Sequence, residues 1–452
     1  MPLPTGTATI HLVLLGCPKN RVDSEAALAR LCDAGYQPVA APEQAGLVLV
    51  NTCAFLAAAR DEAAAVLDRL AAVKRTVPGQ QLVVTGCLAS LEGEALRQRF
   101  PAVDLVIGSE RLDDLPALLT PPPLPDGPPR CRPGGHYLGA SLVHRSSSLA
   151  GGVAAYLKIG DGCRRSCSFC LIPTIKGPPE SRPAAAILAE ARSLLAQGVR
   201  ELVLVGQDPT RWQDEGRRLP DLVRLLARLE GLVWLRLLYL FPGPAVRALL
   251  PSFAAEPRLV PYLDVPLQHV DSEVLGRMNR PYGEPEVRAL VADLRAGVPG
   301  LFLRSGFILG HPGEDEEAFA RLRAFVGEGH FQQLSLFPYS DEPGTASHGQ
   351  EGKLPPAMVA ARHRQLEHDF RLIRQAQAAR LRGRRLAVLL EQPAASRAGL
   401  WEGRHAGQAP EVDGRTFVSV PTPSPPAIQP GAVVTARIVS TLGADLWGVL
   451  EP

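Results

Sequence analysis

Cysteine is scarce in this sequence, with 8 residues among 452. So few cysteines in so long a chain exclude a disulfide-rich secreted scaffold. No run of about 18 apolar residues occurs, so the sequence predicts no membrane-spanning helix. The opening stretch MPLPTGTATI has neither the charged nor the apolar part of a secretion signal. We therefore expect a cytoplasmic protein with reduced thiols and no membrane partner.

An excess of charge of one sign is also missing, because the formal net charge is +2. Such a balance produces no global electrostatic attraction toward nucleic acid or a membrane surface. The 46% hydrophobic content is that of an ordinary globular protein. At roughly 100–200 residues per domain, the chain has room for two to four domains.

Short apolar runs alternate with helical patterns between residues 11 and 110. The runs HLVLLGC, LVLVNTC, QLVVTGC and LVIGSE are typical of buried parallel strands. Stretches such as SEAALARLCDAG, which lie between them, have helical periodicity. This alternation predicts an α/β domain with a doubly wound parallel sheet, which we place at residues 1–118.

A Pro/Gly-rich segment, TPPPLPDGPPRCRPGG, marks a domain boundary inside a predicted linker at 119–150. Six further strands with helical segments between them follow, and they indicate a partial (βα)6 barrel. A long polar helix ends this second domain, which we place at 151–383. Beyond it, alternating segments broken by Gly and Pro predict a small antiparallel β-barrel at 384–452.

Three of the cysteines, Cys163, Cys167 and Cys170, lie close together in GDGCRRSCSFCLIP. They follow the first strand of the predicted partial barrel, and such barrels carry their chemistry at the carboxyl ends of the strands. Their spacing lets one loop present three soft thiolates to a 4Fe-4S cluster, leaving one iron open for a substrate or cofactor. Structural zinc is the alternative, but zinc takes four ligands and favours CxxC pairs, and no matching second pair follows.

Cys17, Cys53 and Cys87 each stand where a predicted strand ends and a helix begins. The carboxyl ends of parallel strands share one edge of a sheet, where ligands bind, and helix N-termini favour the thiolate form. We therefore expect a second metal site there. The alternative is that these thiols are buried apolar fillers, but three at equivalent positions favour a site.

The spacing Cys-x3-Cys-x2-Cys, with Phe169 before the last cysteine, resembles that of the radical S-adenosylmethionine (SAM) enzymes. The resemblance implies that the open iron binds SAM and that SAM is cleaved to a radical that abstracts hydrogen from an unactivated carbon. With the second trio, the chain resembles the methylthiotransferases, which carry two 4Fe-4S clusters. The family implies an N-terminal methylthiotransferase domain, a radical SAM domain and a TRAM-type barrel.

Within this family, LGCPKNRVDSE at residues 15–25 is similar to the signature of the RimO subgroup. The segments VPYLDVPLQHVDSEVLGRMNR, FPYSDEPGTA and APEVDG also resemble that subgroup. The resemblance implies methylthiolation of the β-carbon of an aspartate in small-subunit ribosomal protein S-twelve, with SAM as radical source and methyl donor. Two places depart from the family pattern: His311 replaces an aromatic residue in GHPGE, and Ser305-Gly306 stand where two threonines are common.

A few further residues are candidates for the site. Phe169 and Gln207 are candidate SAM contacts, although Gln207 could equally cap the following helix. His269 ends a strand, where it would either line a cavity at the site or have a hydrogen-bonded structural role. His311 is a candidate ligand. Cys32 and Cys131 have no partner in spacing, and we assign neither a function.

The charge of the C-terminal segment favours a protein substrate over tRNA. From residue 386 onward it has four arginines and no lysine against six acidic residues, a net charge of −2. RNA-binding barrels need basic surfaces with aromatics, whereas an acidic barrel suits a basic ribosomal protein. We expect Glu411 and Asp413 to contribute to that docking surface.

We therefore expect ribosomal protein S-twelve as the partner, with nucleic acid not required, and an electron donor such as flavodoxin or ferredoxin. Two alternatives stay open. The first is a tRNA adenosine methylthiotransferase, and the second is a zinc-stabilised, non-enzymatic ribosome-binding module.

Overall fold

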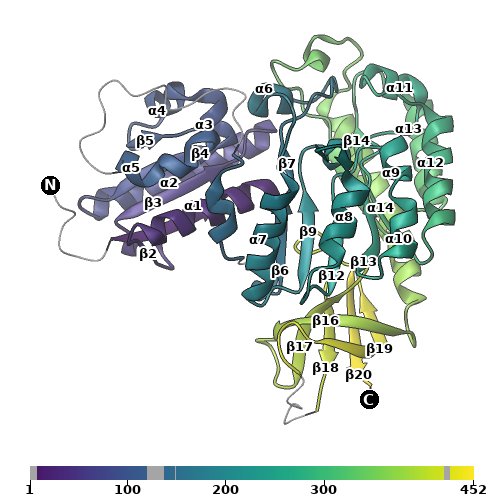
Figure 1. Cartoon of the computed structure of the whole chain (residues 1–452). Coiled ribbons are helices and arrows are strands. Elements are labelled where there is room, and N and C mark those ends of the chain that lie inside the picture. Colours follow the sequence, from purple (N-terminus) through teal and green to yellow (C-terminus); the bar gives the residue numbers. More distant parts are fainter. Residues whose placement is uncertain (1–7, 120–136, 148, 422–427, 452) are drawn as a thin grey trace.

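The computed structural model describes residues 8–119, 137–147, 149–421 and 428–451 (Figure 1). An N-terminal α/β part lies beside a larger central α/β part, and a small β-barrel lies below the latter. Cys131 and most of the predicted linker fall outside the described residues. Among the residues described, no helix combines the length and apolar character needed to cross a membrane.

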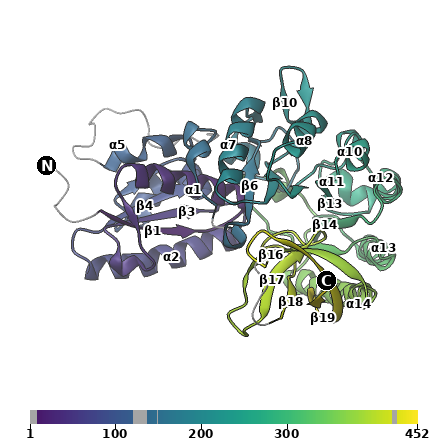
Figure 2. The same ribbon diagram turned by 60° about the horizontal axis from the view of Figure 1, so that its bottom comes forward.

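The N-terminal part is a parallel five-stranded sheet in the order β2-β1-β3-β4-β5. Alternate residues of β3 point to opposite faces: Leu47 and Leu49 pack in one core, and Val48 and Val50 pack in another. Side chains of α1 pack in the first of these cores and side chains of α2 pack in the second, so helices cover both faces of the sheet (Figure 2). The predicted doubly wound sheet is confirmed. Its elements are β1 Thr9–Leu14, α1 Pro18–Asp33, β2 Gln37–Pro38, β3 Leu47–Thr52, α2 Ala57–Thr76, β4 Gln81–Gly86, α3 Cys87–Glu92, α4 Glu94–Arg99, β5 Leu105–Val106 and α5 Leu115–Leu119.

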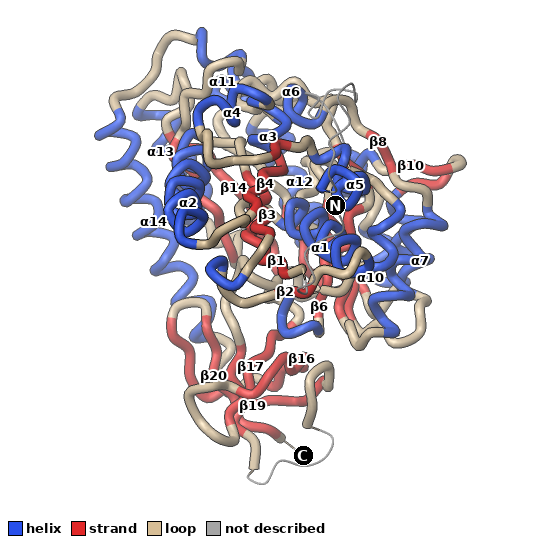
Figure 3. The backbone as a smooth tube through the Cα atoms, turned by 90° about the vertical axis from the view of Figure 1, so that its left-hand side faces the viewer, coloured by secondary structure: helices blue, strands red, loops and turns tan. Residues whose placement is uncertain are grey.

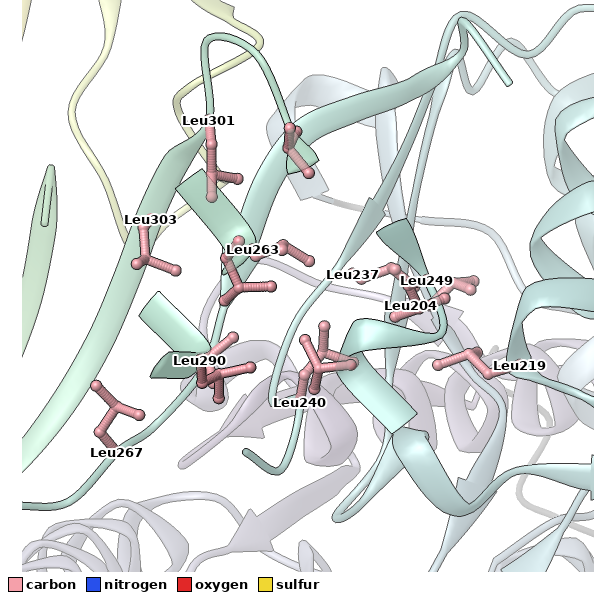
Figure 4. Packing of buried hydrophobic residues seen from close by; sticks show 14 of the residues in the cluster. Leu204, Leu219, Leu237, Leu240, Leu249, Leu263, Leu267, Leu290, Leu301 and Leu303 are labelled. Carbon is pink, nitrogen blue, oxygen red and sulfur yellow. The ribbon is translucent and has the colours of Figure 1, made fainter. Parts of the chain in front are cut away.

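The central part is a six-stranded parallel sheet in the order β15-β14-β13-β12-β9-β6. Strands β6 and β15 stand at its two edges, so the sheet is an open barrel of six units, as predicted. Leucines from strands and helices pack together between the sheet and its helices (Figure 4), and burial of this apolar surface stabilises the domain.

The strands of this sheet are β6 Ala154–Lys158, β9 Glu201–Val205, β12 Trp234–Leu237, β13 Leu259–Asp264, β14 Phe302–Leu309 and β15 Gln333–Pro338. Its helices are α6 Ile172–Lys176, α7 Ala184–Ala196, α8 Leu219–Ala227, α9 Pro244–Arg247, α10 Leu250–Ala255, α11 Ser272–Arg277, α12 Glu284–Gly297, α13 Glu316–Gly327 and α14 Pro356–Ala379. Two short pairs lie outside it: β7 Gly160–Asp161 with β8 Glu180–Ser181, and β10 Gln213–Asp214 with β11 Arg217–Arg218.

The C-terminal part is a closed five-stranded barrel in the order β16-β17-β18-β20-β19. It lies at the bottom of Figure 3. Four of its pairings are antiparallel, but β18 and β20 are parallel, because the chain crosses to β19 before it returns beside β18. The strands are β16 Arg385–Pro393, β17 Leu400–His405, β18 Thr416–Ser419, β19 Val433–Leu442 and β20 Asp445–Leu450.

Buried ion pairs join the N-terminal sheet to the central one. Arg145 pairs with Glu25 of α1 at 2.6 Å and with Glu190 of α7 at 2.7 Å. Lys158 of β6 pairs with Asp23 of α1 and, at 3.3 Å, with Asp161. These contacts orient the carboxyl edge of the first sheet toward the carboxyl ends of the central strands.

The loop 409–414 of the small barrel also joins the domains. Glu411 pairs with Arg21 of α1 at 2.6 Å, and Asp413 accepts a hydrogen bond from the Tyr262 hydroxyl of β13 at 2.7 Å. Both carboxylates are thus engaged within the chain, while the Glu411 side chain stays partly exposed, and their part in substrate docking remains a prediction.

Candidate functional site

Both cysteine trios open onto one cavity of about 340 Å³, which lies where the carboxyl ends of the two sheets meet. All six predicted ligands line it: Cys17, Cys53, Cys87, Cys163, Cys167 and Cys170. The geometry therefore places the two trios around one common space.

The N-terminal trio stands at the ends of three neighbouring strands. Cys17 precedes α1 and follows β1 after a short turn, Cys53 follows β3 directly, and Cys87 is the first residue of α3 after β4. Because β1, β3 and β4 are adjacent and parallel, their ends meet at one sheet edge. This arrangement is the one that the strand pattern predicts.

Two glycines let these strand ends approach. Gly16 has a φ of +97°, and a Cβ there would lie 2.8 Å from the Cβ of Cys53. Gly86 has a φ of +94°, and a Cβ there would lie 2.5 Å from the carbonyl oxygen of Thr52. Side chains at either position would therefore combine backbone strain with a clash.

Asn20 ties the trio together. Its amide nitrogen donates to the carbonyl oxygens of Leu15 at 3.2 Å and Thr52 at 3.1 Å. Its Oδ1 lies 3.7 Å from the Cys87 sulfur and 4.0 Å from the Cys17 sulfur. Sequence reasoning missed this role, although Asn20 belongs to the motif GCPKN.

The second trio is held by its own loop. The Cys163 sulfur accepts a hydrogen bond from the Arg165 amide at 3.4 Å, and the Cys170 sulfur accepts one from the Ile172 amide at 3.4 Å. The loop continues into α6, whose Ile175 packs in the same core as Cys87. This packing of α6 against α3 brings the two trios to one cavity.

Burial disfavours the charged form of the free thiols. It raises the pKa of Cys87 and that of Cys170 to about 12 each, while Lys176 opposes the shift at Cys87 and Arg280 opposes it at Cys170. Burial also raises the pKa of Cys53. A bound metal centre reverses this preference, because ligating thiols are deprotonated.

The donor chemistry of each trio fits a 4Fe-4S cluster, in which soft thiolates are the protein ligands. Across the part of the chain that the structure describes, no three His, Cys, Asp or Glu side chains are grouped as ligands of a single metal ion. The thiols stand instead around the wall of a cavity that is larger than one ion.

The two predicted SAM contacts also lie at this cavity. Phe169 and Gln207 line it, and the Gln207 Oε1 is buried without a hydrogen-bond partner among the described residues. Such an unpaired acceptor fits a ligand that donates a hydrogen bond.

The two histidines that the sequence singled out are not at the cavity wall. His269 is buried, lies 3.3 Å from Glu314 and accepts a hydrogen bond from the Asp271 amide, which is the structural role. His311 is buried behind the cysteine loop, where its Nε2 is 3.1 Å from the Ser168 hydroxyl and its ring meets Phe169 edge-on at 6.3 Å. His311 thus supports the loop. Cys32 is exposed on α1, away from both trios.

Three family models match the chain in succession. They are the "Uncharacterized protein family UPF0004" at residues 9–108, the Radical SAM superfamily at 157–326 and the TRAM domain at 383–450. The Radical SAM superfamily implies one 4Fe-4S cluster and SAM as cofactors.

Solved structures share the fold. The SAM methyltransferase TsrM from Kitasatospora setae, solved with cobalamin and a 4Fe-4S cluster, has a TM-score of 0.57 and 17% identity, covering 76% of this chain and 77% of its own. The cobalamin-dependent SAM radical enzyme OxsB has a TM-score of 0.52 and 12% identity, covering 81% of this chain and 56% of its own. At these identities the likeness shows the fold alone.

Curated relatives are far more similar. "Ribosomal protein uS12 methylthiotransferase RimO" of Anaeromyxobacter sp. (strain K) is 39% identical, covering 97% of this chain and 92% of the relative. The protein of the same name from Myxococcus xanthus is 37% identical, covering 98% and 91%. The protein of that name from Geobacter sulfurreducens is 36% identical, covering 97% and 98%. With this identity along nearly its whole length, the chain belongs to the RimO family of radical SAM methylthiotransferases.

Proposed function

We propose that this chain transfers a methylthio group to the β-carbon of an aspartate in ribosomal protein uS12. The observation that carries the proposal is the single cavity onto which both cysteine trios open. One carbon must be reached both by a radical and by a sulfur donor, and a shared cavity permits that. The names of the relatives support uS12 as the substrate.

In this proposal Cys163, Cys167 and Cys170 hold the cluster that works with SAM, and Cys17, Cys53 and Cys87 hold a second cluster. When bound, these groups supply an electron for SAM cleavage and a site for the sulfur that is transferred. The chain contributes positive charge around the anionic thiolates, from Lys176 on one side and Arg280 on the other.

Phe169 and Gln207 would contact SAM, and the apolar part of the wall would keep water from the reacting carbon. Leu240, Phe241 and Pro266 form that part of the wall. Exclusion of water protects a reactive intermediate from side reactions.

The partners follow from the same proposal. The substrate is uS12, free or in the ribosome, and an electron donor such as flavodoxin or ferredoxin supplies the reductant. The cytoplasm is the compartment we propose, because thiols stay reduced there.

The decisive test uses anaerobically purified protein with reconstituted iron and sulfide. We would incubate it with SAM, a chemical reductant and either recombinant uS12 or unmodified tRNA, and analyse both by mass spectrometry. We expect a methylthio adduct on one aspartate of uS12. Modification of the tRNA alone would support a tRNA methylthiotransferase, and a colourless protein with bound zinc would support the ribosome-binding module.

A matched pair of variants separates the two trios. Cys163, Cys167 and Cys170 replaced together by alanine should abolish SAM cleavage and keep one cluster's worth of iron. The same replacement of Cys17, Cys53 and Cys87 should keep SAM cleavage and abolish methylthiolation. Cys32→Ala, at an exposed thiol, serves as the control. Full methylthiolation by the second triple variant would show that the N-terminal thiols are packing residues.

A further inference from the structure

Lys19 presents an amine to the cavity at the end where the N-terminal trio lies. It is the second residue of α1, two positions after Cys17, and it lines the cavity with both trios. Its side chain is half-buried. Within the described ranges, no hydrogen bond or ion pair of Lys19 is seen, and its one specific contact is a cation–π contact.

That contact positions the amine. The Lys19 Nζ lies 3.9 Å from the centroid of the Tyr239 ring. Tyr239 is itself held in a left-handed conformation, with a φ of +63°, and its amide donates to Asp264 at 3.1 Å. A bulky residue in that region is strained, so the surrounding structure holds the Tyr239 ring in this place.

The buried carboxylate beside Tyr239 is already engaged. Asp264 accepts the Tyr239 amide hydrogen bond and lies 3.8 Å from the Arg304 guanidinium. Among the residues that the structure describes, no carboxylate forms a hydrogen bond or an ion pair with Lys19.

The other cations of the cavity wall have different surroundings. Arg165 pairs with Asp208 at 2.8 Å, and Lys176 is buried 3.6 Å from Asp161. Arg280 lies over the rings of Phe169 and Phe241, beside the second cysteine trio. Lys19 is thus the cation of the wall that stands beside the N-terminal trio with its charge available.

We propose that the Lys19 ammonium binds the carboxylate of the substrate aspartate. This inference rests on the proposed function and names the residue that would position its substrate. The carboxylate carbon of aspartate is bonded directly to the β-carbon, so an anchor on the carboxylate places the β-carbon within the cavity. A carboxylate that enters a largely apolar cavity also needs a positive partner to offset its lost hydration.

The proposal makes a statement about specificity. Asparagine has the shape of aspartate but lacks the charge, so a lysine anchor favours aspartate over asparagine. Hydrogen bonds between charged groups contribute more than neutral ones. Replacement of Lys19 should therefore remove the preference for aspartate and leave asparagine binding unchanged.

The test measures equilibrium binding on cluster-loaded protein without reductant, so that it does not depend on turnover. Two fluorescent peptides carry the uS12 target sequence, one with the aspartate and one with asparagine in its place. We expect Lys19→Met to weaken binding of the aspartate peptide by about 10- to 100-fold, the range for a hydrogen bond to a charged group. The asparagine peptide should bind both proteins equally, and Lys19→Arg should retain part of the preference.

Lys74→Met is the matched control. It removes the same charge from the same domain, at a lysine on α2 that pairs with Asp104 at 2.5 Å. It should bind both peptides as the unaltered protein does. Iron content and the affinity for SAM are measured for every variant.

Three outcomes would overturn the inference: equal binding of the two peptides by the unaltered protein, equal weakening of both peptides by Lys19→Met, and loss of SAM affinity in place of peptide affinity. The last would assign Lys19 to the cofactor. Methylthiolation of full-length uS12 by the unaltered protein tests the proposed function separately, so either idea can fail alone.

Discussion

At the scale of single residues, the N-terminal trio depends on a glycine at a position that has no room for a side chain. Gly16 adopts a left-handed conformation directly before Cys17, and any Cβ there would meet Cys53. The close approach of two strand ends thus requires glycine for two reasons, its backbone conformation and its lack of a side chain.

We predict that Gly16→Ala lowers stability and lowers iron bound at the N-terminal trio. Gly35→Ala is the control, because Gly35 has a φ of +96° but nothing within 4 Å of its added Cβ. Both variants carry the left-handed backbone cost, about 1–2 kcal/mol, so the difference between them reports the clash at Cys53. Urea unfolding and iron analysis measure it, and equal effects of the two variants would refute the steric argument.

At the scale of elements, the small barrel is joined to the central sheet by buried charges. Arg404 of β17 pairs with Glu201 of β9 at 2.5 Å and also with Glu391 of β16. Arg236 of β12 pairs with Glu201 at 2.7 Å. Burial of Glu201 would raise the pKa of its carboxyl, but Arg404 and Arg236 hold that pKa below its usual value.

We predict that Arg404→Met destabilises the protein by about 3–5 kcal/mol, since it removes the cation that pairs with Glu391 and one of the two cations that pair with the buried Glu201. Arg415→Met is the control within the same barrel, because Arg415 is half-exposed and pairs with Glu402 near the surface. Its cost should be about 1 kcal/mol or less. Urea unfolding followed by tryptophan fluorescence compares the two, and similar costs would show that burial of the first pair is unimportant.

His405 at the same junction should make stability depend on pH. Burial, together with Arg236 and Arg404, lowers the pKa of His405 to about 3. Between that value and the ordinary value of about 6.5, the unfolded chain binds a proton that the folded chain does not. The free energy of unfolding therefore falls as the pH drops below about 6.5. His405 accounts for a loss of about 2 kcal/mol between pH 7 and pH 5.

We predict that His405→Asn makes the loss of stability between pH 7 and pH 5 smaller, because the substituted residue does not titrate. Asparagine keeps an acceptor for the Gly407 amide, which donates to the His405 Nδ1 at 3.0 Å. His368→Asn, on the exposed face of α14, makes the same chemical change as a control. Unfolding midpoints at several pH values measure the slope, and a parallel slope for His405→Asn and the unaltered protein would contradict the prediction.

At the scale of the whole molecule, loop 409–414 ties the small barrel to both other domains. Glu411 reaches α1 and Asp413 reaches β13, while the Pro410 carbonyl oxygen accepts a hydrogen bond from the Tyr156 hydroxyl of β6 at 3.2 Å. Two of the acidic residues that contribute to the negative charge of the barrel, Glu411 and Asp413, thus make contacts within the chain.

We predict that Asp413→Ala lowers stability by about 1–3 kcal/mol, because it removes the acceptor of the Tyr262 hydroxyl and of the Ala409 amide. Glu411→Gln should cost about 1 kcal/mol or less, because the Glu411 side chain is nearly half-exposed. Thermal unfolding compares them. If Asp413→Ala weakens uS12 binding without any loss of stability, loop 409–414 takes part in substrate docking and the structural explanation is wrong.

Much of this protein was determined by the sequence alone. The fold class follows from local periodicity, since apolar runs and helical patterns report the conformation of short segments. The strand-end positions of the N-terminal cysteines follow for the same reason, and the spacing of Cys163, Cys167 and Cys170 is itself local. Resemblance of the motifs to one family was then confirmed by relatives that match nearly the whole chain.

Only the tertiary structure decided which distant residues meet. Cys87 and Cys170 share a cavity because α6 packs against α3. Arg21 forms an ion pair with Glu411, which lies near the other end of the sequence. A count of charges could not separate paired carboxylates from free ones, and a motif could not show that the Lys19 amine is available. Local patterns reflect the conformation of neighbouring residues, whereas burial and pairing depend on how separate elements pack together.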